Sequence, residues 1–190
     1  MPKLQLRRTL RAQRQQLSNT QQSHAAQQLA AHLSQLPWLD HTQHIGVYYP
    51  SDGEISPLFF IRQHPNKHFY LSSLALHEAR TLIFHPWQPD EPLRYNHLQV
   101  AEPVQQNVTK PILELDMLLM PLVGFDRYGG RLGMGGGFYD YSLRNVSASS
   151  SKPRLVGIAH ACQEVEKLPI DEWDIPLDAV VTDRDVLLFD

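Results

Sequence analysis

Apolar side chains recur at helical spacing in two stretches near the start of the chain. Three leucines are interspersed along residues 3–16, and a second set follows the i, i+3, i+4 rule: Ala26, Leu29, Ala30, Leu33 and Leu36. Residues 18–20 (Ser-Asn-Thr) offer candidate N-caps for the second stretch, and Pro37 cannot continue a helix. The pattern therefore predicts one helix over residues 3–16 and another that ends at Pro37.

Short apolar runs later in the chain have the length and composition of buried strands. They occupy residues 45–49, 69–71, 81–84, 115–121, 154–159, 179–182 and 186–188. A turn at residues 50–53 leads through Glu54 to a short helix that ends near Arg62, and residues 147–152 are predicted as a loop. Because strands alternate with helices, we expect the α/β class, with a largely parallel or mixed sheet and helices on both faces.

Six of the ten glycines lie within residues 129–137, after the predicted strand 115–121. Glycine can adopt positive φ and lacks Cβ, so consecutive N–H groups can approach an anion closely. Arg131 adds a guanidinium suited to phosphate, and a helix starting near Gly137 or Phe138 would direct its positive end there. Since ligands bind at the carboxyl ends of strands in open α/β sheets, this loop predicts a phosphate site. A flexible turn is the alternative, because the run matches neither the Walker nor the Rossmann fingerprint.

Asp140 places a carboxylate directly after the glycines. A carboxylate repels phosphates unless a cation lies between them, and Mg²⁺ commonly combines one or two carboxylates with substrate phosphates. A magnesium ligand is therefore one interpretation of Asp140. The other is a first-turn helix residue that the macrodipole favours.

The first predicted helix is strongly basic. It carries no acidic residue and five basic ones, Lys3, Arg7, Arg8, Arg11 and Arg14. All except Arg8 recur at spacings of three or four and share one face. Such a face is either merely solvated or a source of charge for a polyphosphate or an acidic ligand tail. Glu54 also has two interpretations. It is either an acidic residue that is favourable in the first turn of a helix or a functional carboxylate.

Composition narrows the class of protein. The 190 residues are 42% apolar and 19% charged, as expected for one soluble globular domain over residues 1–190. The start lacks the apolar segment of a signal peptide, so we expect a cytoplasmic protein. A lone Cys162 cannot form an internal disulfide, and a net charge of −3 argues against broad nucleic-acid binding. The ten histidines fall outside zinc-protease or paired-cysteine patterns and suggest surface positions.

Together these features resemble the 5-formyltetrahydrofolate cyclo-ligase family, also called methenyltetrahydrofolate synthetases. The resemblance extends over almost the whole chain, and residues 129–140 are its most specific part. The other matching positions are Lys3, Arg7, Tyr48, Tyr49, Pro50, Glu54, Ile55, Glu102, Pro103, Pro121, Phe125, Asp126, Gln163, Leu168, Pro169, Asp174, Asp178, Val180 and Thr182.

The resemblance implies an ATP-dependent ligase. It would convert 5-formyltetrahydrofolate and ATP into 5,10-methenyltetrahydrofolate, ADP and phosphate, and would require Mg²⁺. The formyl oxygen would be phosphorylated and N10 would then close the ring, a reaction that depends mainly on positioning and charge. The expected partners are ATP and the folate, with no nucleic acid and no membrane, and the expected form is a monomer. The implied fold is the three-layer αβα sandwich of ribose-phosphate isomerases and CoA transferases, which alone does not fix an activity.

The resemblance also assigns roles position by position. ATP would contact Lys3, Leu4, Gln5, Leu6, Arg7, Arg131, Leu132, Gly133, Met134, Gly135, Gly136, Gly137, Phe138 and Tyr139. Arg7 and Arg131 would be catalytic. The folate would contact Tyr49, Glu54, Met134 and Phe138, and Mg²⁺ would bind Asp140 and Asp174.

Three positions depart from the family pattern. Met134 stands where Tyr, His or Arg is expected, Phe138 replaces a Tyr, and Gly136 stands where some members carry Lys. Loss of one charge-assisted contact costs about 1.5–3 kcal/mol, so we expect weaker ATP binding rather than lost activity.

Two other functions stay open. A non-catalytic nucleotide-binding protein on the same scaffold would keep the loop, but it would not need both Asp140 and Asp174. A protein that binds RNA or another partner through the basic first helix would show steep salt dependence and no ATP hydrolysis.

Overall fold

The computed structural model describes residues 2–75, 80–104, 107–144, 152–169, 171 and 174–189. Within these ranges the α-helices are α1 (Lys3–Gln15), α2 (Asn19–Leu33), α3 (Leu58–Gln63) and α4 (Phe138–Leu143). Short 3-10 helices are η1 (Leu39–His41), η2 (Ile112–Glu114) and η4 (Ala161–Gln163). The loop predicted at residues 147–152 lies outside the described ranges except for Lys152.

Seven strands form the main sheet, in the order β11-β10-β9-β6-β1-β2-β3. Their bounds are β1 (His44–Val47), β2 (His68–Leu74), β3 (Leu82–Pro86), β6 (Met117–Pro121), β9 (Arg154–Ala159), β10 (Ala179–Thr182) and β11 (Val186–Leu188). The five strands from β10 to β2 are parallel, and β3 and β11 are antiparallel edges. The mixed α/β class and all seven predicted strands are confirmed.

The strand order reverses between β1 and β6. From β1 the chain adds β2 and β3 on one side, whereas from β6 it adds β9, β10 and β11 on the other. The carboxyl ends of β1 and β6 therefore diverge into different connections at the middle of the sheet. In open α/β sheets this switch point is where ligands bind.

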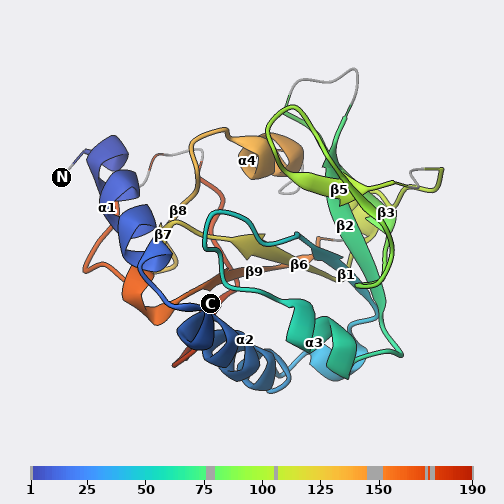
Figure 1. Cartoon of the computed structure of the whole chain (residues 1–190), viewed down its shortest axis with the longest axis horizontal. Coiled ribbons are helices and arrows are strands. Elements are labelled where there is room, and N and C mark those ends of the chain that lie inside the picture. Colours follow the sequence, from blue (N-terminus) through green and yellow to red (C-terminus); the bar gives the residue numbers. More distant parts are fainter. Residues whose placement is uncertain are drawn as a thin grey trace.

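Alternating side chains divide the core between the two faces of the sheet. Ile45 and Val47 of β1 pack in the cluster with α2 and α3, which cover one face (Figure 1). Leu118 and Met120 of β6 face the opposite cluster, to which α4 contributes Leu143. Helices thus lie on both faces, as predicted, although α4 is only six residues long.

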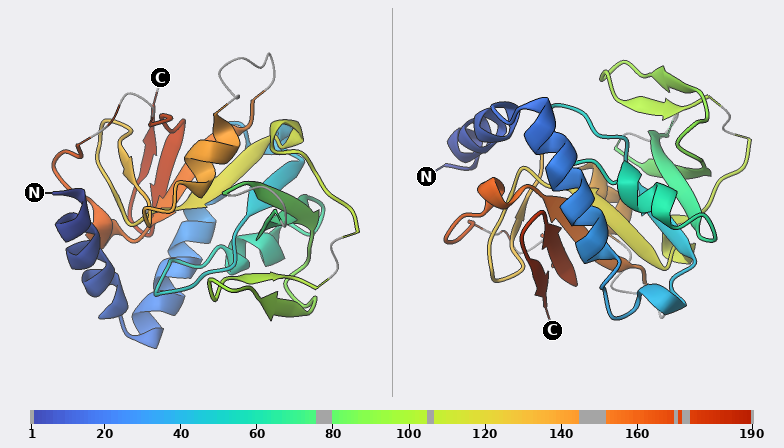
Figure 2. Two further views of the ribbon diagram at one scale, coloured as in Figure 1. Left: turned by 90° about the horizontal axis from the view of Figure 1, so that it is seen from above. Right: turned by 60° about the horizontal axis from the view of Figure 1, so that its bottom comes forward.

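The two N-terminal helices differ in how they are held. A capping box between Ser18 and Gln21 starts α2, whose buried residues lie in the main core. The helix ends at Leu33 rather than at Pro37 as predicted, because tighter turns follow, with Leu36 N–H donating to Leu33 O at 3.2 Å. Helix α1 lies at the side of the sheet beside η4 (Figure 2), where Leu10 belongs to a small separate cluster.

Two small hairpins were not predicted. One pairs β4 (Leu93–Tyr95) with β5 (Ala101–Pro103), and the other pairs β7 (Gly124–Phe125) with β8 (Arg131–Leu132). Both contribute to the site below, the first through the residues between its strands and the second through Arg131 and Leu132. Within the described ranges, no helix has the length and hydropathy needed for a membrane span.

Candidate functional site

A cavity of about 810 Å³ lies at the switch point of the sheet. It is bounded by the residues after β1, by the carboxyl end of β6, by α1, by the glycine loop and by the tip of the β4–β5 hairpin. Its volume lies within the range of small-molecule sites. Of the predicted site residues, those that line it are Lys3, Arg7, Tyr49, Glu54, Arg131, Leu132, Gly133, Met134, Gly135, Gly136, Gly137, Phe138, Tyr139, Asp140 and Asp174.

The N-terminal segment contributes charge to one end of the cavity. Lys3 Nζ lies 2.6 Å from Asp171 Oδ2 and 3.3 Å from Asp174 Oδ2, and the hydrogen bond to Asp171 chiefly raises the pKa of Lys3. Arg7 Nε donates to Gly133 O at 2.8 Å, which ties α1 to the glycine loop. Leu4, Gln5 and Leu6 do not line the cavity. Leu4 and Gln5 are exposed and Leu6 packs beside the Leu10 cluster, so contact of these three residues with ATP stays a prediction.

The glycine run divides into two parts with different roles. Gly129 and Gly130 belong to the turn of the β7–β8 hairpin, so the run is not the single loop that was predicted. Buried Asp126 holds this turn, because its Oδ1 accepts from the N–H groups of Tyr128 and Gly130 at 2.9 Å. A Cβ on Gly130 would lie 2.6 Å from Asp126 Oδ2, so only glycine fits.

The second part of the run, residues 133–137, lines the cavity. Gly135 has φ +99° and Gly137 has φ +70°, a region that side chains rarely adopt. A Cβ on Gly135 would lie 3.4 Å from Arg7 Cζ, so the loop backbone passes close to that guanidinium. Gly137 is the N-cap of α4, which begins at Phe138 as predicted. Backbone and guanidinium groups therefore meet at this wall.

Both predicted metal ligands face the cavity, and each already has a cationic partner. Arg131, whose side chain is 8% exposed, pairs with Asp140 and donates from Nε to Ile175 O at 3.1 Å. Asp174 pairs with Lys3 and accepts from Asp171 N–H at 2.8 Å. Among the described residues, no group of three or more His, Cys, Asp or Glu is arranged to hold a metal. Two carboxylates suit a Mg²⁺ ion whose other ligands come from phosphates. They are too few for a metal site built from protein side chains alone.

Glu54 lies in a tight turn after β1. Glu54 N–H donates to Ser51 O at 2.8 Å, and both central residues have positive φ, Asp52 at 50° and Gly53 at 75°, as in a type I′ turn. Ser51 N–H and Oγ donate to Glu54 Oε2 at 3.0 and 3.3 Å. Because α3 begins only at Leu58, Glu54 is not a first-turn helix residue. Burial raises the pKa of this carboxyl.

The basic face of α1 is not simply solvated. Arg11 Nε and Arg14 Nη2 donate to Asp52 Oδ2 at 2.7 and 2.8 Å, and Arg14 is fully buried. The hydrogen bond from Arg11, followed by the one from Arg14, lowers the pKa of Asp52 to about 2. The basic face of α1 thus anchors the turn that carries Glu54. Helical spacing alone did not show which residues this face contacts.

The opposite end of the cavity is apolar, and the sequence analysis missed it. Its wall includes Leu74, Leu82, Leu98 and Val100, the last two from the tip of the β4–β5 hairpin. Asn96 organises this tip, since its Oδ1 accepts from Leu98 N–H at 2.9 Å and from Val100 N–H at 3.1 Å. A polar turn residue between two short strands was the only sequence signal for this hairpin. The signal is weak, because each strand is only three residues long.

Glu102 joins the hairpin to the main sheet. This buried carboxyl accepts from Leu74 N–H and from Asn96 Nδ2, both at 2.8 Å. Because the tip is held through Asn96 and the base through Glu102, the apolar wall is formed before any ligand binds. Four aromatic residues of the described chain also line the cavity: Tyr48, Tyr49, Phe138 and Tyr139. Burial of the hydroxyl raises the pKa of Tyr139.

Fold and site together define a class of protein. It is an α/β protein with a ligand cavity at the switch point of a mostly parallel sheet, basic and glycine-rich at one end and apolar at the other. The model of the 5-formyltetrahydrofolate cyclo-ligase family matches residues 1–183. The chain belongs to this family, whose members are ATP-dependent ligases.

Individual proteins agree with this assignment. The chain is 42% identical to 5-formyltetrahydrofolate cyclo-ligase of Escherichia coli over 176 residues, which is 91% of this chain and 96% of the relative. It is 41% identical to the Haemophilus influenzae protein of the same name, over 91% and 93% of the two chains. The solution structure of Aquifex aeolicus 5,10-methenyltetrahydrofolate synthetase superposes with a TM-score of 0.82 at 28% identity, covering 99% of this chain and 93% of that one. A synthetase structure from Mycoplasma pneumoniae gives 0.75 at 26% identity, covering 97% and 100%.

Proposed function

We infer that the protein is the ATP-dependent ligase of this family and converts 5-formyltetrahydrofolate into 5,10-methenyltetrahydrofolate. The observation that carries this conclusion is the family match over residues 1–183, together with one cavity that receives the matching motif residues from both ends of the chain. Lys3 and Arg7 come from the N-terminus, Glu54 from the turn after β1, and Asp174 from the C-terminal part. A pure binding protein gives no reason for this combination of cations and carboxylates.

ATP occupies the basic end in this proposal. The phosphates lie against Lys3, Arg7 and Arg131 and against the backbone of residues 133–137, where N–H groups and guanidinium forks can accept a polyphosphate. Asp140 and Asp174 would hold the Mg²⁺ that accompanies the nucleotide, and the ion would offset the repulsion between these carboxylates and the phosphates. Arg131 and Lys3, which pair with these carboxylates here, would bind the phosphates instead and leave the carboxylates to the ion.

The folate occupies the rest of the cavity. Glu54 accepts hydrogen bonds from the N–H groups of the pterin, and Tyr49, Met134 and Phe138 contact its ring. The aromatic ring of the substrate's aminobenzoyl group packs on Leu98 and Val100, because that wall is apolar and pre-formed. This placement sets the formyl group between Glu54 and the nucleotide.

The chemistry follows from this placement. An N-formyl group is an amide, so its oxygen has to become a leaving group. The formyl oxygen attacks the γ-phosphorus and ADP departs. N10 then attacks the formyl carbon and loses its proton, and the bond from carbon to the phosphorylated oxygen breaks to release phosphate. Arg7 and Arg131 stabilise the negative charge that the transferred phosphoryl group carries, which is the main form of catalysis in such transfers.

Absorbance at the methenyltetrahydrofolate band tests the function. The protein is mixed with 5-formyltetrahydrofolate, Mg²⁺ and ATP, and a parallel sample omits ATP. A rise that depends on ATP is expected. No rise, with ATP still binding in calorimetry, would identify a non-catalytic nucleotide-binding protein instead.

We further propose the three-layer αβα sandwich of ribose-phosphate isomerases and CoA transferases as the fold, with helices on both faces of the sheet in support. We also propose a cytoplasmic monomer without nucleic-acid or membrane partners. The net charge of −3 and the lone cysteine support this proposal. Light scattering and a salt titration of RNA binding test it.

A further inference from the structure

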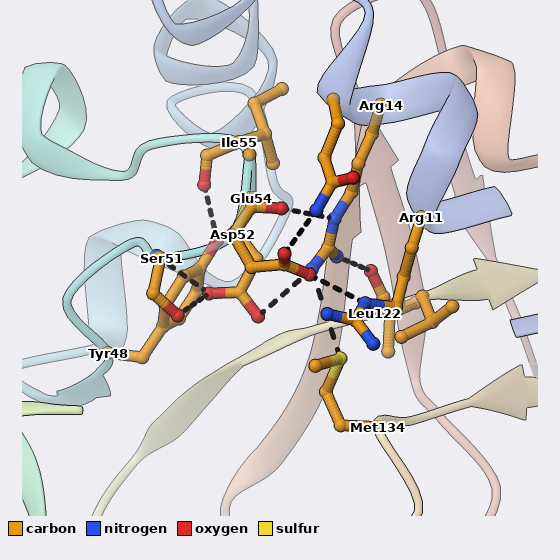
Figure 3. A network of polar contacts seen from close by, with 12 residues as sticks. Arg11, Arg14, Tyr48, Ser51, Asp52, Glu54, Ile55, Leu122 and Met134 are labelled. Carbon is orange, nitrogen blue, oxygen red and sulfur yellow. Dashed lines mark hydrogen bonds and ion pairs between the residues drawn. The ribbon is translucent and has the colours of Figure 1, made fainter. Parts of the chain in front are cut away.

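Arg14 is a fully buried cation at the meeting point of the segments that build the cavity. Figure 3 shows its guanidinium among the turn after β1, the end of β6 and the glycine loop. Nε donates to Asp52 O at 2.9 Å, Nη2 to Asp52 Oδ2 at 2.8 Å, and Nη1 to Leu122 O at 3.1 Å. Nη2 also lies 3.8 Å from Glu54 Oε1 and 3.9 Å from Met134 Sδ. One side chain therefore connects four segments that are far apart in the sequence.

Burying this charge is costly unless every donor finds a partner. Anchoring the turn alone does not require it, because Arg11 and Gln15 also donate to the carboxylate of Asp52. Gln22 adds two neutral bonds, from Nε2 to Arg14 O at 3.3 Å and to Gly53 O at 3.2 Å. What Arg14 adds is a positive charge 3.8 Å from Glu54, whose side chain is 9% exposed.

The charge of Arg14 opposes the effect of burial on Glu54. Burial raises the pKa of Glu54, while hydrogen bonds from Ser51 and the charge of Arg14 lower it. The charge of Asp52 raises the pKa of Glu54, and the phenols of Tyr48 and Tyr139 also interact with this carboxyl. Arg11 interacts with it through charge as well. Arg14 therefore does more than Arg11 to keep Glu54 ionised.

We propose that Arg14 is a positioning residue for the folate: it holds Glu54 in place and ionised, so that the carboxylate accepts hydrogen bonds from the pterin. The inference rests on the proposed role of Glu54 in folate binding. Arg14 itself does not line the cavity, so it acts only through Glu54 and its turn. A pterin presents N–H donors, and a carboxylate accepts from two of them at once, whereas a protonated carboxyl also presents a donor that clashes with one.

Two substitutions separate charge from geometry. Arg14→Gln removes the charge, so we expect the KM for 5-formyltetrahydrofolate to rise at least about tenfold at pH 7 while the KM for ATP stays within about twofold. The pH at which the folate KM begins to rise on acidification moves upward, because Glu54 loses its nearby cation. Arg14→Lys keeps a charge but lacks the planar fork that reaches the acceptors of Asp52 and Leu122 at the same time. It therefore raises the folate KM and leaves the pH profile near that of the wild type.

Glu54→Gln and Gln22→Ala complete the experiment. In the Glu54→Gln background, Arg14→Gln produces no further shift of the pH profile. Gln22→Ala removes neutral bonds to the same turn, so it lowers the melting temperature without moving the pH profile.

If Arg14→Gln raises both KM values equally and keeps the wild-type pH profile, the residue is merely structural and the proposal fails. If Glu54→Gln alone leaves the folate KM unchanged, the role of Glu54 fails instead. Circular dichroism verifies folding, and Arg14→Lys carries the test if Arg14→Gln does not fold.

Discussion

The ion pair between Arg131 and Asp140 joins two charges of the proposed nucleotide site. Asp140→Asn keeps the shape of the side chain but removes the charge that pairs with Arg131 and that binds Mg²⁺ in the proposed site. We expect kcat to fall by about 10- to 100-fold at a fixed Mg²⁺ concentration, the worth of one charge-assisted contact, and to recover in part as Mg²⁺ rises. Steady-state rates over a magnesium titration measure this effect.

Glu164→Gln provides the control for Asp140→Asn. Glu164 forms an ion pair with Arg127 at 2.6 Å and does not line the cavity, so its loss should leave turnover near the wild-type value. Wild-type turnover in Asp140→Asn, with no dependence on Mg²⁺ beyond that of the parent, would remove Asp140 from the metal site.

Asp52 makes the stability of the protein sensitive to acid. Its folded-state pKa of about 2 lies below the ordinary value of 3.8, chiefly because Arg11 donates to it. A carboxyl with a depressed pKa contributes stability above its unfolded pKa, and this contribution disappears as the pH falls through the folded pKa. We expect Asp52→Asn to lower the free energy of unfolding at pH 7, and the difference from wild type to shrink between about pH 4 and pH 2. Urea titrations across this interval measure it, and a difference independent of pH would contradict the linkage.

Single residues were predictable where a motif carries the chemistry. Arg131, Asp140 and the glycines of residues 133–137 lie together in the cavity as their adjacency indicated. Arg14 was not distinguishable from its neighbours, because helical spacing shows which residues share a face and not what that face contacts. Its burial depends on Leu122 and Asp52, which are remote in sequence.

At the scale of elements, the β4–β5 hairpin offers a matched test of the apolar wall. Leu98 is 48% exposed and lines the cavity, whereas Val104, directly after β5, is 46% exposed and does not. We expect Leu98→Ala to raise the KM for 5-formyltetrahydrofolate about fivefold through lost apolar contact, with the KM for ATP unchanged. Val104→Ala should leave both constants at the wild-type values. Equal behaviour of the two variants would place the aromatic ring of the folate elsewhere.

The central strands leave no room for extra volume. A Cβ on Gly46 of β1 would lie 2.7 Å from Leu118 Cδ1, 2.8 Å from Leu115 Cδ1 and 3.1 Å from Phe84 Cε1. We expect Gly46→Ala to lower the free energy of unfolding by about 1–3 kcal/mol, as overpacking does. Gly133→Ala is the stability control, since its Cβ meets no atom within 4 Å. Denaturant unfolding compares the two, and equal stabilities would show that the sheet relaxes around the methyl group.

Elements were predictable in proportion to their length and burial. Each strand of the main sheet contains a short apolar run, and β9, β10 and β11 have the predicted bounds. The two hairpins escaped because strands of two or three residues carry too little periodicity. Tertiary contacts hold them instead, from Glu102 to Leu74 for one and from Asp126 to Leu168 for the other.

At the scale of the whole molecule, the cavity exists only because distant segments meet at the switch point. Periodicity supplied the strands but not their order, and the reversal between β1 and β6 is what brings Glu54 and the glycine loop together. The family resemblance assigned both to one site without showing how they meet. The apolar end had no motif, so only the folded chain reveals it.

The position of α1 against the glycine loop predicts which part of the molecule becomes more rigid when a nucleotide binds. Two residues of α1 are buried, Leu10 and Arg14, whereas α2 buries five, so α1 has less apolar contact to hold it than α2 has. Helix α1 should therefore open locally at a lower free energy than the whole molecule unfolds. MgATP bridges α1 and the glycine loop in the proposed site, so only the closed state binds it. At 100 times Kd, binding stabilises the closed state by about 2.7 kcal/mol, which slows opening-dependent exchange by about 100-fold.

Amide hydrogen exchange with and without MgATP measures this response. We expect strong additional protection for the amides of α1, and little for those of the edge strand β11, because local opening of β11 leaves the cavity intact. The Asp140→Asn variant should lose most of the protection, since the metal that accompanies the nucleotide is held less well. Protection confined to residues 133–137, with α1 exchanging as before, would mean that the nucleotide binds the loop alone. Lys3 and Arg7 would then act on the folate or on the reacting formyl group rather than on ATP.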